Sequence, residues 1–327
     1  MAPQPDLTVT LTNPRADRIS RVRALSGRSV RLRTGRFLVE GPQCVREAVR
    51  FVPDDVVDVY MTPTTAERYP EIVEAASSAG LYLHVGTPEV LAAMSLDAQG
   101  VLAVCRTRSV ELAFPSVEFG SPLRSEAPSI ASVSARERAS LSAQSASETK
   151  GNCETYRLVA ILNNVRDPGN AGTVIRAADA AGADLVILAG NSVELHNPKL
   201  VRSTAGSLFH LNVVTGVALS DAVAALRAVG VQVLAADGAG EHDLDELQDV
   251  SDSVVRRLSP SRSEGVETPD LTAPTAWVFG NEAWGLCNSD RLLANAVVRV
   301  PIRGKAESLN LATAATVCLY ASSRAQR

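Results

Sequence analysis

The sequence predicts an α/β protein with parallel sheets. Short apolar runs alternate with amphipathic segments of helical period, and three blocks of glycine and short polar residues directly follow such runs. Continuous apolar runs are typical of strands that are covered on both faces. With 327 residues and 46% hydrophobic content, the chain is long enough for two domains.

The first 119 residues predict a small α/β domain. Strands are expected at 36–40, 56–61, 81–85 and 101–105, and helices at 42–50 and 65–79.

A run of positive charge opens this domain. Between Arg15 and Arg36 there are eight arginines against the single acid Asp17, although the net charge of the chain is −4. Arginine is well suited to bidentate phosphate contact, whereas a solvated helix face explains the same run equally well. The candidate contacts to RNA are Arg21, Arg28, Arg31 and Arg33. With 4% aromatic residues, a platform for stacking bases is poorly supported.

Residues 120–151 predict a flexible linker. They contain nine serines, six alanines and no aromatic residue, a composition that cannot bury a core. The second domain is then expected to span residues 152–327, with a Ser- and Pro-rich surface insertion at 251–274 that could include a helix around 254–258.

The second domain predicts a parallel sheet with flanking helices. Its strands are expected at 156–162, 184–188, 211–214, 231–235, 275–279 and 297–300. A helix is expected over 171–181, with Ala171, Val174, Ile175 and Ala178 as its buried stripe, which leaves Arg176 exposed. Another is expected over 220–229, with Ser220 as its N-cap.

Three blocks carry the candidate chemistry. The first is Asn164 to Gly172 with Arg176, the second is Phe279 to Leu286, and the third is Pro301 to Asn310. In an α/β fold such loops expose backbone N–H groups to a ligand at the carboxyl edge of the sheet. Each block also has a purely structural interpretation. Asn170 and Ser308 are good helix N-caps, and Glu282 is a plausible solvated acid.

Taken in order, the three blocks resemble the three motifs of the SpoU branch of the SPOUT superfamily, the RNA ribose 2′-O-methyltransferases. They read Asn-x-x-Asp-Pro-x-Asn-x-Gly-x-x-x-Arg, Gly-Asn-Glu-x-x-Gly-Leu and Pro-Ile-x-Gly-x-x-Glu-Ser-Leu-Asn. Residues 199–207 are similar to the connecting loop of that family, and the N-terminal part of the chain, with Arg36 to Gly41, resembles its small RNA-binding domain.

This resemblance implies a trefoil-knotted methyltransferase domain, S-adenosylmethionine as cofactor, a homodimer and an RNA substrate, more often ribosomal than transfer RNA. The implied catalytic residues are Asn170, Arg176, Glu282, Ser308 and Asn310. The implied cofactor contacts are Gly280, Asn281, Ile302, Ser308 and Leu309. Arg303 stands where the family often has an apolar residue.

Composition and motifs also disfavour several classes. The five cysteines and four histidines show no spacing of a zinc site or disulfide framework, so no metal is expected. The sequence shows neither a membrane span nor a signal peptide, which favours the cytoplasm. A tRNA methyltransferase, a catalytically silent RNA-binding protein and a nucleotide-dependent enzyme of other chemistry remain alternatives. The sequence does not identify the modified nucleotide, nor does it distinguish a housekeeping role from antibiotic resistance.

Overall fold

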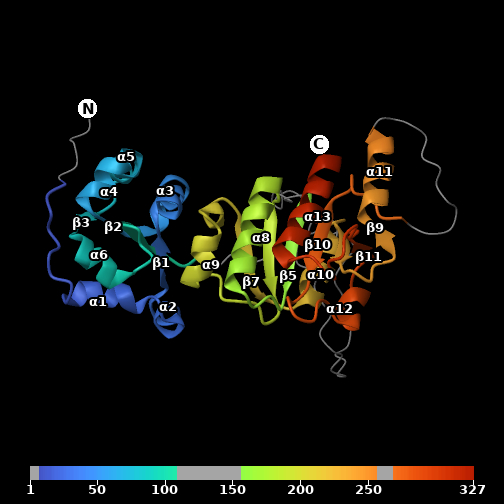
Figure 1. The fold of residues 1–327 in the computed structure, drawn as a ribbon, viewed down its shortest axis with the longest axis horizontal. Coiled ribbons are helices and arrows are strands. Elements are labelled where there is room, and N and C mark those ends of the chain that lie inside the picture. The colour runs from blue at the N-terminus through green and yellow to red at the C-terminus, as the bar shows by residue number, and fades with distance from the viewer. Residues whose placement is uncertain (1–6, 109–155, 256–267) are drawn as a thin grey trace, which may run out of the picture. The chain divides into compact units, whose positions relative to one another are not determined.

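The computed structural model describes residues 7–108, 156–255 and 268–327 of the chain (Figure 1). Within these ranges the strands form two sheets, one of four strands and one of seven. The predicted α/β class is confirmed.

The four-stranded sheet has the order β1-β4-β2-β3. β4 runs antiparallel to β1 and β2, and β2 runs parallel to β3. The strands are β1 (Arg36–Glu40), β2 (Val56–Met61), β3 (Leu83–Val85) and β4 (Val101–Arg106). Its helices are α1 (Asp17–Ala24), α2 (Arg28–Thr34), α3 (Pro42–Phe51), α4 (Pro63–Arg68), α5 (Pro70–Ser78) and α6 (Pro88–Met94), with a 3-10 turn at Pro53–Asp55.

Successive side chains of a strand point to opposite faces of the sheet, so the buried residues of this sheet belong to two clusters. Val39 and Val59 pack with side chains of α3 and α5, whereas Leu38 and Tyr60 pack with side chains of α1 and α6. The sheet is therefore covered by helices on both faces.

The helix expected over 65–79 is wrong, because the chain forms two helices there. α4 ends at Arg68, and Tyr69 adopts φ −127° and ψ 62° before Pro70 opens α5. The proline ring disfavours a helical conformation for the residue that precedes it, which explains the break.

The seven-stranded sheet has the order β7-β6-β5-β10-β8-β11-β9, and all its paired strands are parallel. The strands are β5 (Leu158–Asn163), β6 (Leu185–Ala189), β7 (Asn212–Val217), β8 (Gln232–Ala236), β9 (His242–Asp243), β10 (Thr275–Phe279) and β11 (Ala296–Arg299). The helices are α8 (Pro168–Ala181), α9 (Pro198–Ser203), α10 (Leu219–Ala228), α11 (Leu244–Val255), α12 (Asn288–Leu292) and α13 (Leu311–Ala325), with a 3-10 turn at Ser207–Phe209.

Helices α8 and α13 pack side by side on one face of this sheet (Figure 1). The predicted stripe of α8 is confirmed, because Ala171, Val174, Ile175 and Ala178 are all 0% exposed. The expected N-cap at Ser220 is wrong: α10 begins at Leu219, and its N-cap residue is Ala218.

The strand order brings the three sequence blocks to one edge of the sheet. β10 lies between β5 and β8, so the loop after β10 leaves the sheet beside the loop after β5. The loop after β11 leads to α13, which packs on α8. Because parallel strands end at the same edge, blocks more than a hundred residues apart meet there.

Two predicted segments fall largely outside the described residues. The linker at 120–151 lies entirely outside them, as do residues 256–267 of the expected insertion. The first residues of that insertion, 251–255, complete α11. Among the described residues, no helix has both the length and the apolar character that a membrane span requires.

Candidate active site

A chain of hydrogen bonds joins the three sequence blocks. The Nδ2 atom of Asn310 donates to Oδ1 of Asn170 at 3.1 Å, and Nδ2 of Asn170 donates to Oε1 of Glu282 at 3.4 Å. The Glu282 carboxylate also accepts from the backbone N–H groups of Asp167 at 3.1 Å and Arg166 at 3.3 Å. The structure therefore brings together three of the five predicted catalytic residues in direct contact.

Asn281 holds the second block against the first. Its Nδ2 atom donates to the carbonyl of Asn164 at 2.7 Å, and its Oδ1 atom accepts from the N–H of Ala283 at 2.9 Å. Its backbone exchanges two hydrogen bonds with Gly285, at 3.0 and 2.9 Å. Asn281 is 6% exposed, so this side chain shapes the loop in addition to lining the cavity described below.

Gly280 is required by the tightness of this turn. A Cβ atom built there would lie 2.3 Å from the carbonyl carbon of Gly285 and 2.6 Å from the backbone nitrogen of Leu286. Both neighbours are backbone atoms and cannot move aside cheaply. Only glycine fits this position while the turn stays closed.

The structural interpretation of Asn170 and Ser308 as helix N-caps is wrong. The N-cap of α8 is Asp167, whose carboxylate accepts from the N–H of Asn170 at 2.8 Å. This hydrogen bond lowers the pKa of Asp167, with a further contribution from the nearby Lys199 ammonium and an opposing one from partial burial. The N-cap of α13 is Asn310 rather than Ser308, and its Oδ1 atom accepts from the N–H of Ala312 at 2.9 Å. Asn310 thus caps one helix and contacts another.

A cavity of about 470 Å³ lies beside this network. All five predicted cofactor contacts line it: Gly280, Asn281, Ile302, Ser308 and Leu309. Its apolar wall includes Phe279, Leu286 and Val298, and Glu282 and Glu307 contribute carboxylates. A site of this size with an apolar wall and a few polar groups suits a small organic molecule.

Residues outside the three blocks also line this cavity, and Asp237, Gly238 and Arg291 are among those that the sequence did not indicate. Asp237 and Gly238 follow β8, the strand beside β10, and Arg291 lies in α12. The carboxylate of Asp237 pairs with Arg291 at 3.3 Å. An aspartate followed by glycines directly after an apolar strand, in the run Asp237 to Gly240, is the sequence signal that could have indicated this wall.

Arg176 stands apart from the network. It is exposed on α8, does not line the cavity, and has no hydrogen bond or ion pair with any residue in the described ranges. Arg176 follows Asn170 by six positions. Because successive residues of an α-helix are rotated by about 100°, the two side chains point roughly 120° apart around the helix axis. Its guanidinium is consequently available to a ligand outside this chain.

The predicted RNA contacts divide into two groups. Arg21, Arg28 and Arg33 are exposed. Arg31 is only 3% exposed, and its Nε and Nη2 atoms donate to the Glu194 carboxylate at 2.8 and 2.6 Å. Its Nη1 atom donates to the carbonyls of Leu25 and Ser26 at 2.9 and 2.6 Å. The prediction that Arg31 contacts RNA is therefore wrong, because its guanidinium is buried and already paired.

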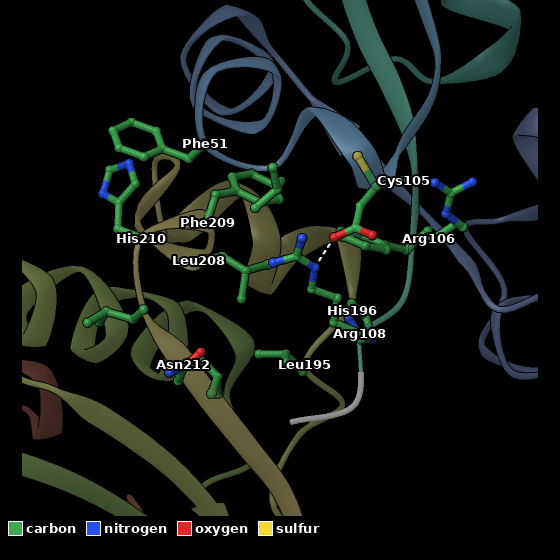
Figure 2. Close-up of a pocket in the computed structure, with 15 residues that line it drawn as sticks. Phe51, Cys105, Arg106, Arg108, Leu195, His196, Leu208, Phe209, His210 and Asn212 are labelled. Carbon is green, nitrogen blue, oxygen red and sulfur yellow. Dashed lines mark ion pairs between the residues drawn. The ribbon is translucent and has the colours of Figure 1, made fainter. Parts of the chain in front are cut away.

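A second cavity, of about 280 Å³, contains none of the three blocks. Phe51, Leu208 and Phe209 contribute to its apolar wall (Figure 2). Arg108 and Asp55, which form an ion pair, also line it. His196 lines this cavity with its ring 4.4 Å from that of Phe37. The pKa of His196 is lowered to about 4, mainly by burial; the Glu194 carboxylate opposes this shift and the Arg31 guanidinium adds to it.

The half-buried His196 predicts a loss of stability in mild acid. Its ordinary pKa is 6.5 and its folded pKa about 4, so below pH 6.5 the unfolded chain binds the proton that the folded chain excludes. The free energy of unfolding should fall by roughly 2 kcal/mol between pH 7 and pH 5 through this group. Urea unfolding of wild type and His196→Gln at several pH values measures it. Equal pH slopes for the two proteins would contradict the assignment.

Comparison with known proteins identifies relatives of the chain. The model of the SpoU rRNA Methylase family matches residues 157–320. The 23S rRNA (uridine(2479)-2′-O)-methyltransferase of Streptomyces viridochromogenes is 36% identical over 167 residues, which are 50% of this chain and 51% of that protein. The chain thus spans about half the length of this relative.

Two further likenesses extend over most of the chain. The 23S rRNA (guanosine-2′-O-)-methyltransferase RlmB of Bordetella pertussis is 24% identical over 290 residues, covering 88% of this chain and 96% of that protein. The crystal structure of the SpoU methyltransferase AviRb from Streptomyces viridochromogenes in complex with the cofactor AdoMet is 27% identical, with a TM-score of 0.66. It covers 94% of this chain and 98% of that one.

Proposed function

Because the chain belongs to the SpoU rRNA methylase family, we propose that it transfers the methyl group of S-adenosylmethionine to a ribose 2′-hydroxyl of ribosomal RNA. The observation that carries this proposal is the network from Asn310 through Asn170 to Glu282 beside the cavity. It joins residues of all three blocks at the carboxyl edge of the sheet, where α/β enzymes bind their ligands.

The cavity residues fit S-adenosylmethionine. Its apolar wall suits the adenine ring. Because Gly280 has no Cβ atom, the turn from Asn281 to Gly285 can stay closed and form one side of the cavity. Glu282, Glu307 and Asp237 place carboxylates around the cavity, which suits a cationic ligand. When bound, this cofactor supplies an electrophilic methyl group on a sulfonium. The residues proposed to hold it are Gly280, Asn281, Ile302, Ser308 and Leu309.

The role of the protein is to place the acceptor hydroxyl and to assist the loss of its proton. Asn170 and Asn310 present amide groups at the junction of the three loops, and the Glu282 carboxylate fixes the Asn170 amide. Holding two reactants in line contributes much of the rate of such a transfer. We assign Ser308, exposed at the same cavity, to the same placement.

Arg176 is proposed to act on the RNA itself. A guanidinium has a pKa above about 12 and is a poor general base. Its positive charge can lower the pKa of a nearby hydroxyl while its planar fork binds the adjacent phosphate. The exposure of Arg176 and its lack of a partner among the described residues support this role.

Several properties of the whole protein belong to the same proposal. The exposed Arg21, Arg28 and Arg33 would bind RNA phosphates, and residues 1–119 would form the RNA-binding domain ahead of a knotted catalytic domain. We also propose a cytoplasmic homodimer. Val317 and Tyr320 of α13, 38% and 44% exposed, offer apolar surface for a second copy, which sedimentation equilibrium would detect.

The test is methyl transfer from isotope-labelled S-adenosylmethionine to purified ribosomal RNA, with transfer RNA as a parallel substrate. The label should be recovered in a 2′-O-methylnucleoside after nuclease digestion. Label on a base would contradict the proposal. If the protein binds the cofactor but transfers no methyl group to either RNA, a catalytically silent RNA-binding protein is favoured. If it methylates transfer RNA alone, transfer RNA takes the place of ribosomal RNA as the proposed substrate.

Asn310 offers a prediction that separates capping from catalysis. In Asn310→Asp the carboxylate can still accept from the N–H of Ala312, but it cannot donate to Asn170. If the Asn170 amide flips, its nitrogen can donate to the new carboxylate, but its oxygen then faces the Glu282 carboxylate. The variant therefore loses either the contact with residue 310 or the contact with Glu282. Thermal stability should stay close to that of wild type, whereas methyl transfer should fall by roughly tenfold or more.

The matched control is Asn310→Ala, which removes the cap as well. It should cost about 1 kcal/mol of stability in addition to activity. An aspartate variant with full activity would show that Asn310 serves only as a helix cap.

A further inference from the structure

Trp284 is an exposed aromatic side chain beside the residues proposed to act on the acceptor ribose. The chain has two tryptophans, and they differ sharply: Trp277 is 0% exposed and hydrogen-bonded to Ser322, whereas Trp284 is 57% exposed. Exposure alone does not mark a site, since Leu292 is 84% exposed. What distinguishes Trp284 is its place in the loop, two residues after Glu282.

The backbone that carries Trp284 is held firmly. The turn between Asn281 and Gly285 is closed by two backbone hydrogen bonds of 3.0 and 2.9 Å. The Asn281 side chain then ties this turn to the carbonyl of Asn164 at 2.7 Å. A ring on such a loop loses little conformational freedom when it meets a ligand, which favours binding.

Arg166 lies over the same ring. Its guanidinium carbon is 5.3 Å from the centroid of Trp284, within the range of a cation–π contact. Arg166 is exposed and forms no ion pair with any residue in the described ranges, and its backbone N–H donates to Glu282. The Trp284 ring and the unpaired Arg166 guanidinium are therefore in contact next to the network of Asn310, Asn170 and Glu282.

This pair matches the chemistry of an RNA strand. Each nucleotide offers a base with a π face and a phosphate with a negative charge, which an aromatic ring and an arginine can bind together. We propose that Trp284, held in place by Arg166, stacks on a base of the substrate RNA beside the acceptor ribose. The proposal rests on the proposed function, whose acceptor site it extends.

The position of the pair favours RNA over the cofactor as its ligand. Trp284 also lines the cavity, so its ring could contact the cofactor adenine instead. Its partner Arg166, however, belongs to the first block, together with Asn170, and not to the turn around Gly280. We therefore place the ring on the acceptor side, and measurement of cofactor affinity distinguishes the two.

Tryptophan fluorescence provides a test that does not depend on methyl transfer. Titration with ribosomal RNA should quench the emission of Trp284, because a stacked base quenches indole, and should leave the buried Trp277 unchanged. The quenching should disappear in Trp284→Phe, which retains a ring and only Trp277 as the emitter. Quenching of equal size in Trp284→Phe would overturn the proposal.

Kinetics of the full-length protein complete the test. Trp284→Ala should weaken RNA binding by about tenfold and leave the cofactor Kd unchanged, while Trp284→Phe should retain most of the affinity. Arg166→Ala should weaken RNA binding and reduce its salt dependence. Leu292→Ala, an exposed apolar side chain outside the network, is the matched control and should behave as wild type.

These outcomes are separable from a failure of the proposed function. A raised cofactor Kd in Trp284→Ala with unchanged RNA binding would assign the ring to the cofactor and overturn the inference. Wild-type protein that binds RNA with quenching of Trp284 but transfers no methyl group would instead overturn the proposed function and leave the stacking platform standing.

Discussion

Replacing Arg176 with alanine is expected to lower the single-turnover rate of methyl transfer by roughly 100-fold or more, if the guanidinium assists loss of the hydroxyl proton. Arg176 is exposed on α8 and has no partner in the described part of the chain, so little of the fold depends on it. Thermal stability and cofactor affinity should therefore be nearly unchanged. Single-turnover methylation at saturating RNA measures the effect directly.

Two further variants make this result specific. Arg176→Lys should rescue little, since an ammonium cannot reproduce the planar fork that contacts hydroxyl and phosphate together. Arg227→Ala removes an exposed arginine of α10 and should leave the rate unchanged. An Arg176→Ala protein that methylates within a few-fold of wild type would show that Arg176 is only a surface cation.

The second large effect is expected from Gly280→Ala. The added methyl group would lie 2.3 to 2.6 Å from backbone atoms of Gly285 and Leu286, so the turn from Asn281 to Gly285 must open. We expect a loss of roughly 2–3 kcal/mol in the free energy of unfolding, as is usual when a well-packed site is overfilled. The cofactor Kd should rise by roughly tenfold or more, because the same turn forms one side of the cavity.

Gly238 provides the matched control for this substitution. It lines the same cavity, its φ is compatible with other residues, and a Cβ there would meet no atom within 4 Å. Gly238→Ala should therefore leave stability close to that of wild type. Calorimetric titration with the cofactor and urea unfolding compare the two alanine variants, and equal stability for both would contradict the importance of the closed turn.

Most strands of the large sheet could be predicted from the sequence because each is a continuous apolar run. The strand expected at 275–279 coincides with β10, and the stripe of α8 is buried as its spacing predicted. The order of the strands could not be predicted in this way. β10 enters between β5 and β8, which precede it by many residues, and periodicity within a strand contains no information about its neighbour.

The candidate site was predicted in part. The contacts among Asn170, Glu282 and Asn310 agree with the grouping of the three blocks, whereas the helix caps were misassigned. Asp167 and Asn170 are both good N-cap residues, as are Ser308 and Asn310. Which of each pair becomes the cap depends on where the loop turns into its helix. In α8 the first helical residue is Pro168, a residue favoured at that position, which makes Asp167 the cap.

The sequence by itself determined the class of fold, the second sheet and the three blocks, because periodicity, turn residues and spacing are local properties of the chain. Only the tertiary structure decided which polar groups meet. Arg31 appeared to be one of eight uncompensated arginines, yet Glu194, 163 positions away, pairs with it in the interior. Trp284 was one aromatic in a chain poor in them, and folding placed it beside Arg166 and Glu282. A charged group or an aromatic ring interacts with groups that lie within a few ångströms of it. The order of residues in the chain does not give these distances, which only the folded structure defines.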